Sequence, residues 1–128
     1  MIVAGCATVH SRMMKSADIL GSNADAFAGH AGHNFPRAIE FASETQSFIA
    51  TVDHGGDREV ISAYERLWNE FHALREDVGR SNGPGAQVDF EPVSQAFANV
   101  ERNVSGYSDA DGSIYARGGF QHDPYYDP

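Results

Sequence analysis

The stretch DREVISAYERLWNEFHALREDVG, residues 57–79, decides the fold of this chain. Its apolar residues recur at alternating intervals of four and three positions, which places them in one stripe along a helix. The stripe contains Val60, Tyr64, Leu67, Phe71, Leu74 and Val78. Glutamates and arginines fall largely off the stripe and give the helix a solvated face. The pattern predicts an amphipathic helix over residues 58–79, with Asp57 as its N-cap and Gly79 at its end.

The segment before this helix carries a similar apolar stripe. Asn34 and Pro36 are residue types that favour the start of a helix, and the glycines after His54 favour its end. The stripe consists of Ala38, Phe41, Thr45, Phe48 and Val52. A helix is therefore expected over residues 35–53.

Two more helices are expected, one toward each end of the chain. The first covers residues 11–31, and its stripe is made mostly of small residues. Its members are Ala17, Leu20, Ala24, Phe27 and Ala31. The last covers residues 90–107, with Asp89 as N-cap and Pro92 in its first turn. Its stripe contains Val93, Phe97, Val100 and Val104.

Four apolar stripes on one chain have to be buried against each other. The first two connections between the expected helices are short and the third is a little longer, so successive helices should run antiparallel. The sequence predicts an all-α protein, an antiparallel up-down four-helix bundle over residues 11–107. Residues 1–10 precede it as an N-terminal segment, and residues 108–128 follow as an irregular, aromatic and acidic tail. A three-helix core with a loosely attached first helix is the competing arrangement.

The charge balance limits the classes of partner. The chain has 9 Lys and Arg residues against 18 Asp and Glu, a formal net charge of −9. Such a surface repels nucleic-acid phosphates and anionic lipid head groups, and the basic residues are scattered singly along the sequence. We therefore expect no nucleic-acid partner. No apolar run approaches the roughly 20 residues of a membrane-spanning helix, so no transmembrane segment is expected either.

The N-terminal segment contains a short motif around the single cysteine. Val3-Ala4-Gly5-Cys6 resembles a bacterial lipobox, in which the cysteine of a lipoprotein precursor is lipidated and becomes the first residue of the mature protein. The resemblance covers four residues and implies a lipid anchor at Cys6, with the outer membrane as the destination. Only five residues precede Cys6, fewer than a signal peptide needs, so this interpretation requires an extension upstream of Met1. The alternative is an ordinary apolar N-terminus with one small hydrophobic cysteine.

Histidines and tail aromatics are the remaining candidate site residues. His30 and His33 are spaced so that both rings can lie on one side of a helical turn and bind Cu, Ni or Zn. Surface histidines beside a glycine-rich turn are the favoured alternative. Phe120, Tyr125 and Tyr126 stand in a polar, proline-flanked tail, where they could bind a partner protein or pack on the bundle itself.

These features predict a non-enzymatic protein. No catalytic constellation stands out and no cofactor is expected. The leading hypothesis is an exported, lipid-anchored envelope protein of the bacterial periplasm or outer membrane, acting by protein binding or in a structural role. The alternative is a periplasmic metal-binding bundle that uses His30 and His33. Without lipidation at Cys6 the protein would be cytoplasmic.

Overall fold

The computed structural model describes the backbone of residues 2–81 and 84–111. Side-chain burial and contacts are described for residues 10–81 and 85–107. The described chain forms four α-helices and contains no strand. They are α1 (Ile2–Ala31), α2 (Pro36–His54), α3 (Asp57–Arg80) and α4 (Pro84–Asp111). The all-α prediction is confirmed.

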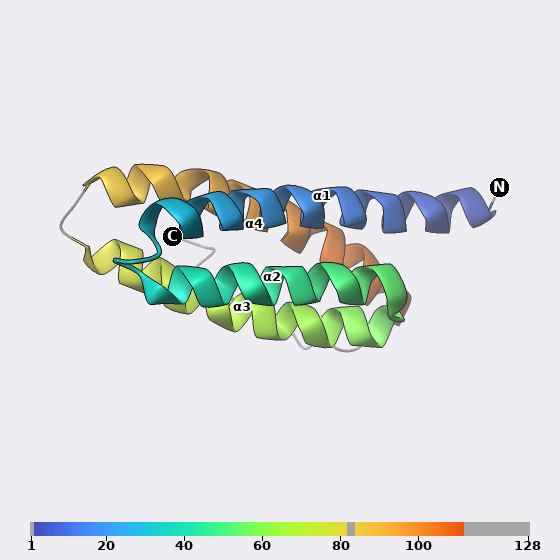
Figure 1. Ribbon diagram of the computed structural model, residues 1–128. Coiled ribbons are helices and arrows are strands. Elements are labelled where there is room, and N and C mark those ends of the chain that lie inside the picture. The colour runs from blue at the N-terminus through green and yellow to red at the C-terminus, as the bar shows by residue number, and fades with distance from the viewer. Residues whose placement is uncertain (1, 82–83, 112–128) are drawn as a thin grey trace.

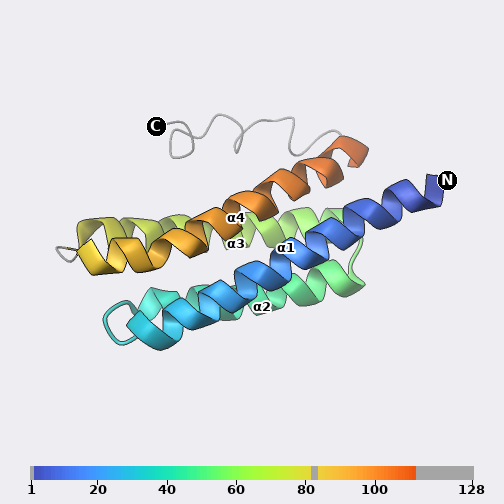
Figure 2. The same cartoon turned by 90° about the horizontal axis from the view of Figure 1, so that it is seen from above.

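The four helices form an antiparallel up-down bundle, as predicted (Figure 1). Successive helices run in opposite directions, and α4 lies beside α1 so that the bundle closes. Each helix contacts its two neighbours, and the diagonal pairs α1/α3 and α2/α4 make no close backbone approach within the described residues. The N-terminal part of α1 extends past the ends of α2 and α3 (Figure 2).

The predicted stripes supply the core. Every stripe residue of α3 is at most 2% exposed, and the stripes of the other three helices are buried as well. Aromatic rings fill the centre: Phe97 of α4 stacks on Phe71 of α3 with ring centroids 4.0 Å apart, and Tyr64 stacks on Phe97 at 5.7 Å. In α1, Met13, Ala17 and Leu20 are 0% exposed. The first helix is therefore part of the core, which excludes a three-helix core with a loose first helix.

A glycine allows α1 and α2 to approach closely. A Cβ atom on Gly21 would lie 2.9 Å from Cδ1 of Ile49 and 3.2 Å from Nε2 of Gln46. A glycine in the middle of a helix destabilises it. Here its missing side chain leaves room for the side chains of Ile49 and Gln46 to lie directly against α1.

The outer helices are longer than the sequence predicted. α1 begins at Ile2 rather than near residue 11, because no proline or strong cap in the N-terminal segment stops helix propagation. α4 begins at Pro84 rather than residue 90 and runs to Asp111, so residues 108–111 of the expected irregular tail are helical. Pro84 suits a first helical position, where its missing N–H is not needed.

Pro92 consequently lies inside α4 instead of in its first turn. A proline inside a helix leaves the carbonyl four residues earlier without its partner, and here that residue is Val88. Val88 is 70% exposed and Pro92 is also exposed, so water can satisfy the carbonyl on this side of the helix.

The starts of α2 and α3 also differ in detail from the expectation. Phe35, not Asn34, is the N-cap of α2, with Pro36 directly after it. Gly56, not Asp57, is the N-cap of α3, and its backbone N–H donates to Oε1 of Glu59 at 2.6 Å. A backbone N–H left open by the helix start is satisfied by a side chain three residues ahead.

Within the described helices, no stretch is both long enough and apolar enough to span a membrane.

Candidate functional site

The structure places the predicted histidines at the end of α1, where they form no metal cluster with other described residues. His30 lies in the last turn of α1, and its Nε2 is 3.2 Å from Oδ2 of Asp89 on α4. His33 lies exposed in the turn that leads to α2. In the described part of the chain, no three His, Cys, Asp or Glu side chains lie close enough together to hold a metal ion. The histidines thus contribute one exposed pair, between His30 and Asp89.

The side chains of the other predicted site residues lie outside the described part of the structure. Cys6 lies within α1, on the part of the helix whose side chains fall outside the described set. Phe120, Tyr125 and Tyr126 lie outside the described residues. Lipidation at Cys6 and partner binding by the tail therefore remain predictions.

The outer face formed by α2 and α3, the α2/α3 face, carries carboxylates that hold several of its arginines in ion pairs. Arg37 Nε lies 3.2 Å from Asp77 Oδ2, and Arg66 Nε lies 3.6 Å from Glu44 Oε2. At the end of α3, Arg80 pairs with Glu76 and with Asp77. Three arginines of this face, Arg37, Arg66 and Arg80, therefore have carboxylate partners.

Glu70 shows how dense the negative charge is on the α2/α3 face. Burial raises the pKa of its carboxyl, and the neighbouring carboxylates of Glu40 and Glu44 raise it further, while Arg37 acts in the opposite direction. One of its oxygens, Oε1, is buried and accepts no hydrogen bond from the described residues. An added anion would meet the same repulsion here.

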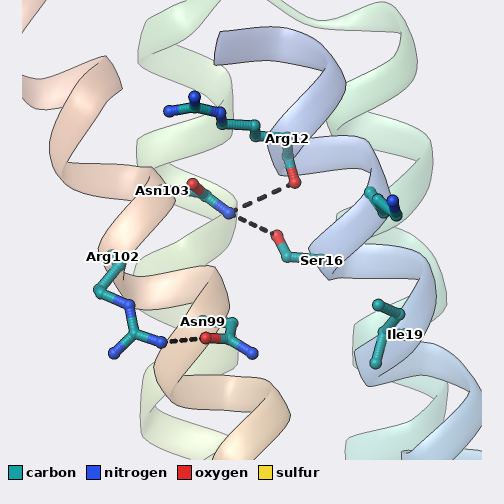
Figure 3. Close-up of a pocket in the computed structure, with 7 residues that line it drawn as sticks. Arg12, Ser16, Ile19, Asn99, Arg102 and Asn103 are labelled. Carbon is teal, nitrogen blue, oxygen red and sulfur yellow. Dashed lines mark hydrogen bonds between the residues drawn. The ribbon is translucent and has the colours of Figure 1, made fainter. Parts of the chain in front are cut away.

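A hollow of about 240 Å3 lies on the opposite side of the bundle, between α1 and α4 (Figure 3). Its lining is cationic and rich in amides, in contrast with the chain as a whole. It consists of Arg12, Lys15, Ser16 and Ile19 from α1 and Asn99, Arg102 and Asn103 from α4. We call these seven residues the α1/α4 hollow.

Helix periodicity explains why these residues meet. The α1 members follow the spacing i, i+3, i+4, i+7 and the α4 members follow i, i+3, i+4, so each set lies along one side of its helix. Both sets flank core positions, since Met13 and Val100 beside them are 0% exposed. Packing of the two stripes therefore places the two sets on either side of one seam.

Hydrogen bonds hold the polar side chains of the hollow in place (Figure 3). Asn103 donates from Nδ2 to Ser16 Oγ at 2.9 Å and to the Arg12 backbone carbonyl at 3.3 Å, which joins α4 to α1. Ser16 in turn donates to the carbonyl of Met13 at 3.0 Å. On α4, the guanidinium of Arg102 donates to Oδ1 of Asn99.

The three cations of the hollow have no described carboxylate at ion-pair distance. None of Arg12, Lys15 and Arg102 forms an ion pair with a carboxylate among the described residues. They are three of the nine Lys and Arg residues in a chain of formal charge −9. The hollow is a local region of positive charge on an acidic protein.

The linings of two other hollows contain both basic and acidic side chains. The larger, about 650 Å3 at the α2–α3 turn, is lined by cations and by Glu59, and its Arg66 is paired with Glu44. The smaller, about 370 Å3, contains His30 and Asp89, which pair with each other. Each of these linings contains a carboxylate, whereas the lining of the α1/α4 hollow contains none.

Sequence reasoning missed the hollow because it treated the basic residues as isolated. Arg12 and Lys15 are neighbours on a helix, but Arg102 joins them only through the packing of α4 on α1. One signal was available: no Asp or Glu stands three or four positions from Arg12 or Arg102, where it would form a pair along the helix.

Chemically, the hollow offers donors and positive charge for an oxyanion. Guanidinium groups bind carboxylate and phosphate oxygens through charge-assisted hydrogen bonds, and amide N–H groups add neutral donors. Neither Glu70 nor Tyr107, the described residues for which a raised pKa is seen, lines it; the pKa of Tyr107 is raised by burial and by Asp57. The arrangement favours binding over proton transfer.

Comparison with known proteins gives no match to a protein family, to a curated protein or to a solved structure.

Proposed function

We propose that this protein is a non-enzymatic helical scaffold of the bacterial envelope, anchored by lipid on Cys6 and acting by binding another protein. The lipobox-like sequence Val3-Ala4-Gly5-Cys6 supports the anchor and, with it, a periplasmic position at the outer membrane. A bundle whose interior is filled by stacked rings meets a partner through its outer surface.

One observation carries the binding role. Among the residues whose side chains the structure describes, Ile39 and Val88 are the two most exposed large apolar ones, at 56% and 70%. Ile39 lies early in α2 and Val88 early in α4, and both helices begin at the end of the bundle opposite the start of α1 (Figure 1). A helix of 30 residues spans about 45 Å, so an anchor at Cys6 would leave these side chains far from the membrane.

Ile39 and Val88 lie on α2 and α4, which are diagonal in the bundle, so a partner that covers this end of the bundle would contact both. In this proposal the end of the bundle that contains Ile39 and Val88, the distal end, faces the partner. The extended N-terminal part of α1 acts as a spacer between the lipid and the bundle.

Mass spectrometry of the full-length gene product, expressed in its own host, tests the anchor. We expect a mature chain that begins at Cys6 and carries lipid on its sulfur. An unmodified Cys6 in a chain that still carries Met1 contradicts the anchoring claim.

Site-specific photo-crosslinking in the same host tests the binding role separately. A crosslinking amino acid replaces Ile39 in one strain and Val88 in another, and exposed Ser62, near the other end of the bundle, is the matched control. We expect a crosslinked protein of defined mass from positions 39 and 88 and none from position 62. No crosslink, or the same crosslinks at all three positions, contradicts binding by the distal end.

A further inference from the structure

The α1/α4 hollow has the most cationic lining among the three hollows described above. Arg12, Lys15 and Arg102 bring three formal positive charges to one hollow. On the α2/α3 face, by contrast, Arg37 and Arg66 already have carboxylate partners. An anion entering the hollow therefore displaces water rather than a protein carboxylate within the described part of the chain.

The amide of Asn99 adds a donor in a fixed direction, whereas the amide N–H groups of Asn103 are already donated to Ser16 and to the Arg12 carbonyl. Because Oδ1 of Asn99 accepts from Arg102, its amide nitrogen is turned toward α1, into the space between the helices (Figure 3). Donors that are already ordered lose little side-chain entropy when they bind a ligand.

The size of the hollow restricts its occupant to a compact group. Its volume is about 240 Å3, below the roughly 300–1,000 Å3 of pockets that enclose drug-sized ligands. A volume of that order corresponds to about eight water molecules, each of which takes about 30 Å3 in the liquid. A single oxyanion with part of its hydration shell fits, and the rest of a larger ligand would extend out of the hollow.

Charge and donor number favour phosphate over carboxylate. A phosphate group carries close to two negative charges near neutral pH and presents three or more acceptor oxygens. A carboxylate carries one charge and presents two oxygens, which a single guanidinium can satisfy. Two guanidiniums, an ammonium and an amide N–H from two helices match the larger number of acceptors.

We propose that the α1/α4 hollow binds one phosphate group, either inorganic phosphate or the end group of a small phosphomonoester. Arg102 and the Asn99 amide hold it from α4, and the flexible, exposed side chains of Arg12 and Lys15 turn toward it from α1. Ile19, which is 47% exposed at the rim, contacts the carbon atoms of a phosphomonoester. The site goes beyond the proposed scaffold function, since it requires neither a lipid on Cys6 nor a partner at the distal end.

Isothermal titration calorimetry of the full chain tests the site. Sodium phosphate and glycerol phosphate are the probes, and sodium chloride at the same ionic strength gives the background. We expect saturable binding of one equivalent, with a dissociation constant on the order of 1 mM or lower. Tighter binding of inorganic phosphate identifies a site for the free ion, and tighter binding of glycerol phosphate identifies a site for a phosphomonoester.

Matched charge variants separate a site from a net-charge effect. The pair Arg12→Gln/Arg102→Gln removes two charges from the hollow, and Arg37→Gln/Arg66→Gln removes two from the α2/α3 face. The first should weaken binding by about tenfold or more, since each lost charge-assisted bond is worth about that factor. The second should change it by less than about twofold.

Two results overturn the proposal: no saturable binding of either phosphate to the parent chain, or equal weakening by the two double variants. Circular dichroism checks that each variant keeps its helices. If Arg12→Gln/Arg102→Gln fails to fold, the exposed single substitution Lys15→Gln takes its place, and unchanged binding by that variant contradicts the assignment. A chain that does not bind phosphate should still form the crosslinks at the distal end, so the two proposals are tested separately.

Discussion

The α1/α4 and α2/α3 sides of the bundle rest on the same core but organise their charge in opposite ways. On the α2/α3 face, arginines are paired with acids at 3.2–3.6 Å, and the pKa of Glu70 is raised by burial and by neighbouring carboxylates. On the α1/α4 side, three cations line a hollow and pair with no described carboxylate. The formal charge of −9 for the whole chain therefore does not describe the α1/α4 hollow.

The difference shows that local charge follows helix pairing rather than composition. Pairs three or four residues apart are visible in sequence, but Arg12 and Arg102 are brought together by the contact between the first and last helices. Long-range repulsion by an acidic surface slows the approach of anions, whereas local cations decide whether one stays bound. The four predictions below test this contrast, beginning with the core that both sides share.

The largest effect is expected from the shared core. Phe97→Ala removes the ring that stacks on Phe71 and on Tyr64, and it should lower the free energy of unfolding by about 3–5 kcal/mol. Urea unfolding followed by circular dichroism measures the loss. Phe97→Leu, which leaves a smaller cavity, is the control and should cost less. A loss below about 1 kcal/mol for the alanine variant would mean that the two sides do not share this core.

A smaller loss is expected where a side chain joins α1 to α4. Asn103→Ala removes the hydrogen bonds to Ser16 Oγ and the Arg12 carbonyl and leaves Ser16, which is 7% exposed, without that donor. We expect destabilisation of about 1 kcal/mol in the same urea assay. Asn99→Ala, which bonds only within α4 among the described residues, is the matched control. Equal effects of the two substitutions would argue against an interhelical role for Asn103.

Each ion pair of the α2/α3 face should contribute less to the free energy of unfolding than the hydrogen bonds of Asn103 do. A double-mutant cycle on Arg37 and Asp77, which lie 3.2 Å apart, should give a coupling free energy of about 0.2–1 kcal/mol. Because both side chains are partly exposed, high salt should reduce this coupling. A coupling that is large and insensitive to salt would show that the pair is less solvated than its exposure indicates.

The smallest effect is a gain of stability at Glu70. Its pKa is raised above the ordinary value of 4.5 in the folded protein, so folding favours the protonated form and ionised Glu70 opposes folding. Stability associated with this group is present below pH 4.5 and is lost as the pH rises through its folded pKa. Glu70→Gln should therefore stabilise the protein by a few tenths of a kcal/mol at pH 7.

Measurement of the free energy of unfolding against pH checks both the sign and the window for Glu70. The advantage of the glutamine variant should shrink toward zero as the pH falls below 4.5. Glu65→Gln, on a residue of the same helix, is the control. A variant less stable than the parent at pH 7 would show that the Glu70 carboxylate has a favourable partner.

Much of the fold could be predicted from the sequence because the stripes are periodic. The stripe from Val60 to Val78 gave α3 to within about one residue at each end, and the buried residues of the other helices were also predicted. The starts of α1 and α4 could not be predicted in this way. A helix continues past its buried stripe wherever nothing stops it, and residues 2–10 and 84–89 carry no strong stop signal.

The candidate site could be predicted far less well, for a physical reason. His30 and His33 stood out because their types and spacing are local features, and in the structure His30 pairs with Asp89. The α1/α4 hollow depends on which helices are neighbours and on their relative register. Asn103 meets Ser16 across 87 positions of sequence, a contact that no periodicity within one helix encodes.

An NMR titration of the isotopically labelled chain with sodium phosphate tests the central contrast most directly, because it reports on both sides of the bundle in one sample. The contrast predicts saturable shifts of the side-chain amides of Asn99 and Asn103 and of the backbone amides near Arg12. Signals from the α2/α3 face around Arg37 and Glu70 should stay in place. Weak, non-saturating shifts over the whole protein, or the largest shifts on the α2/α3 face, would contradict it.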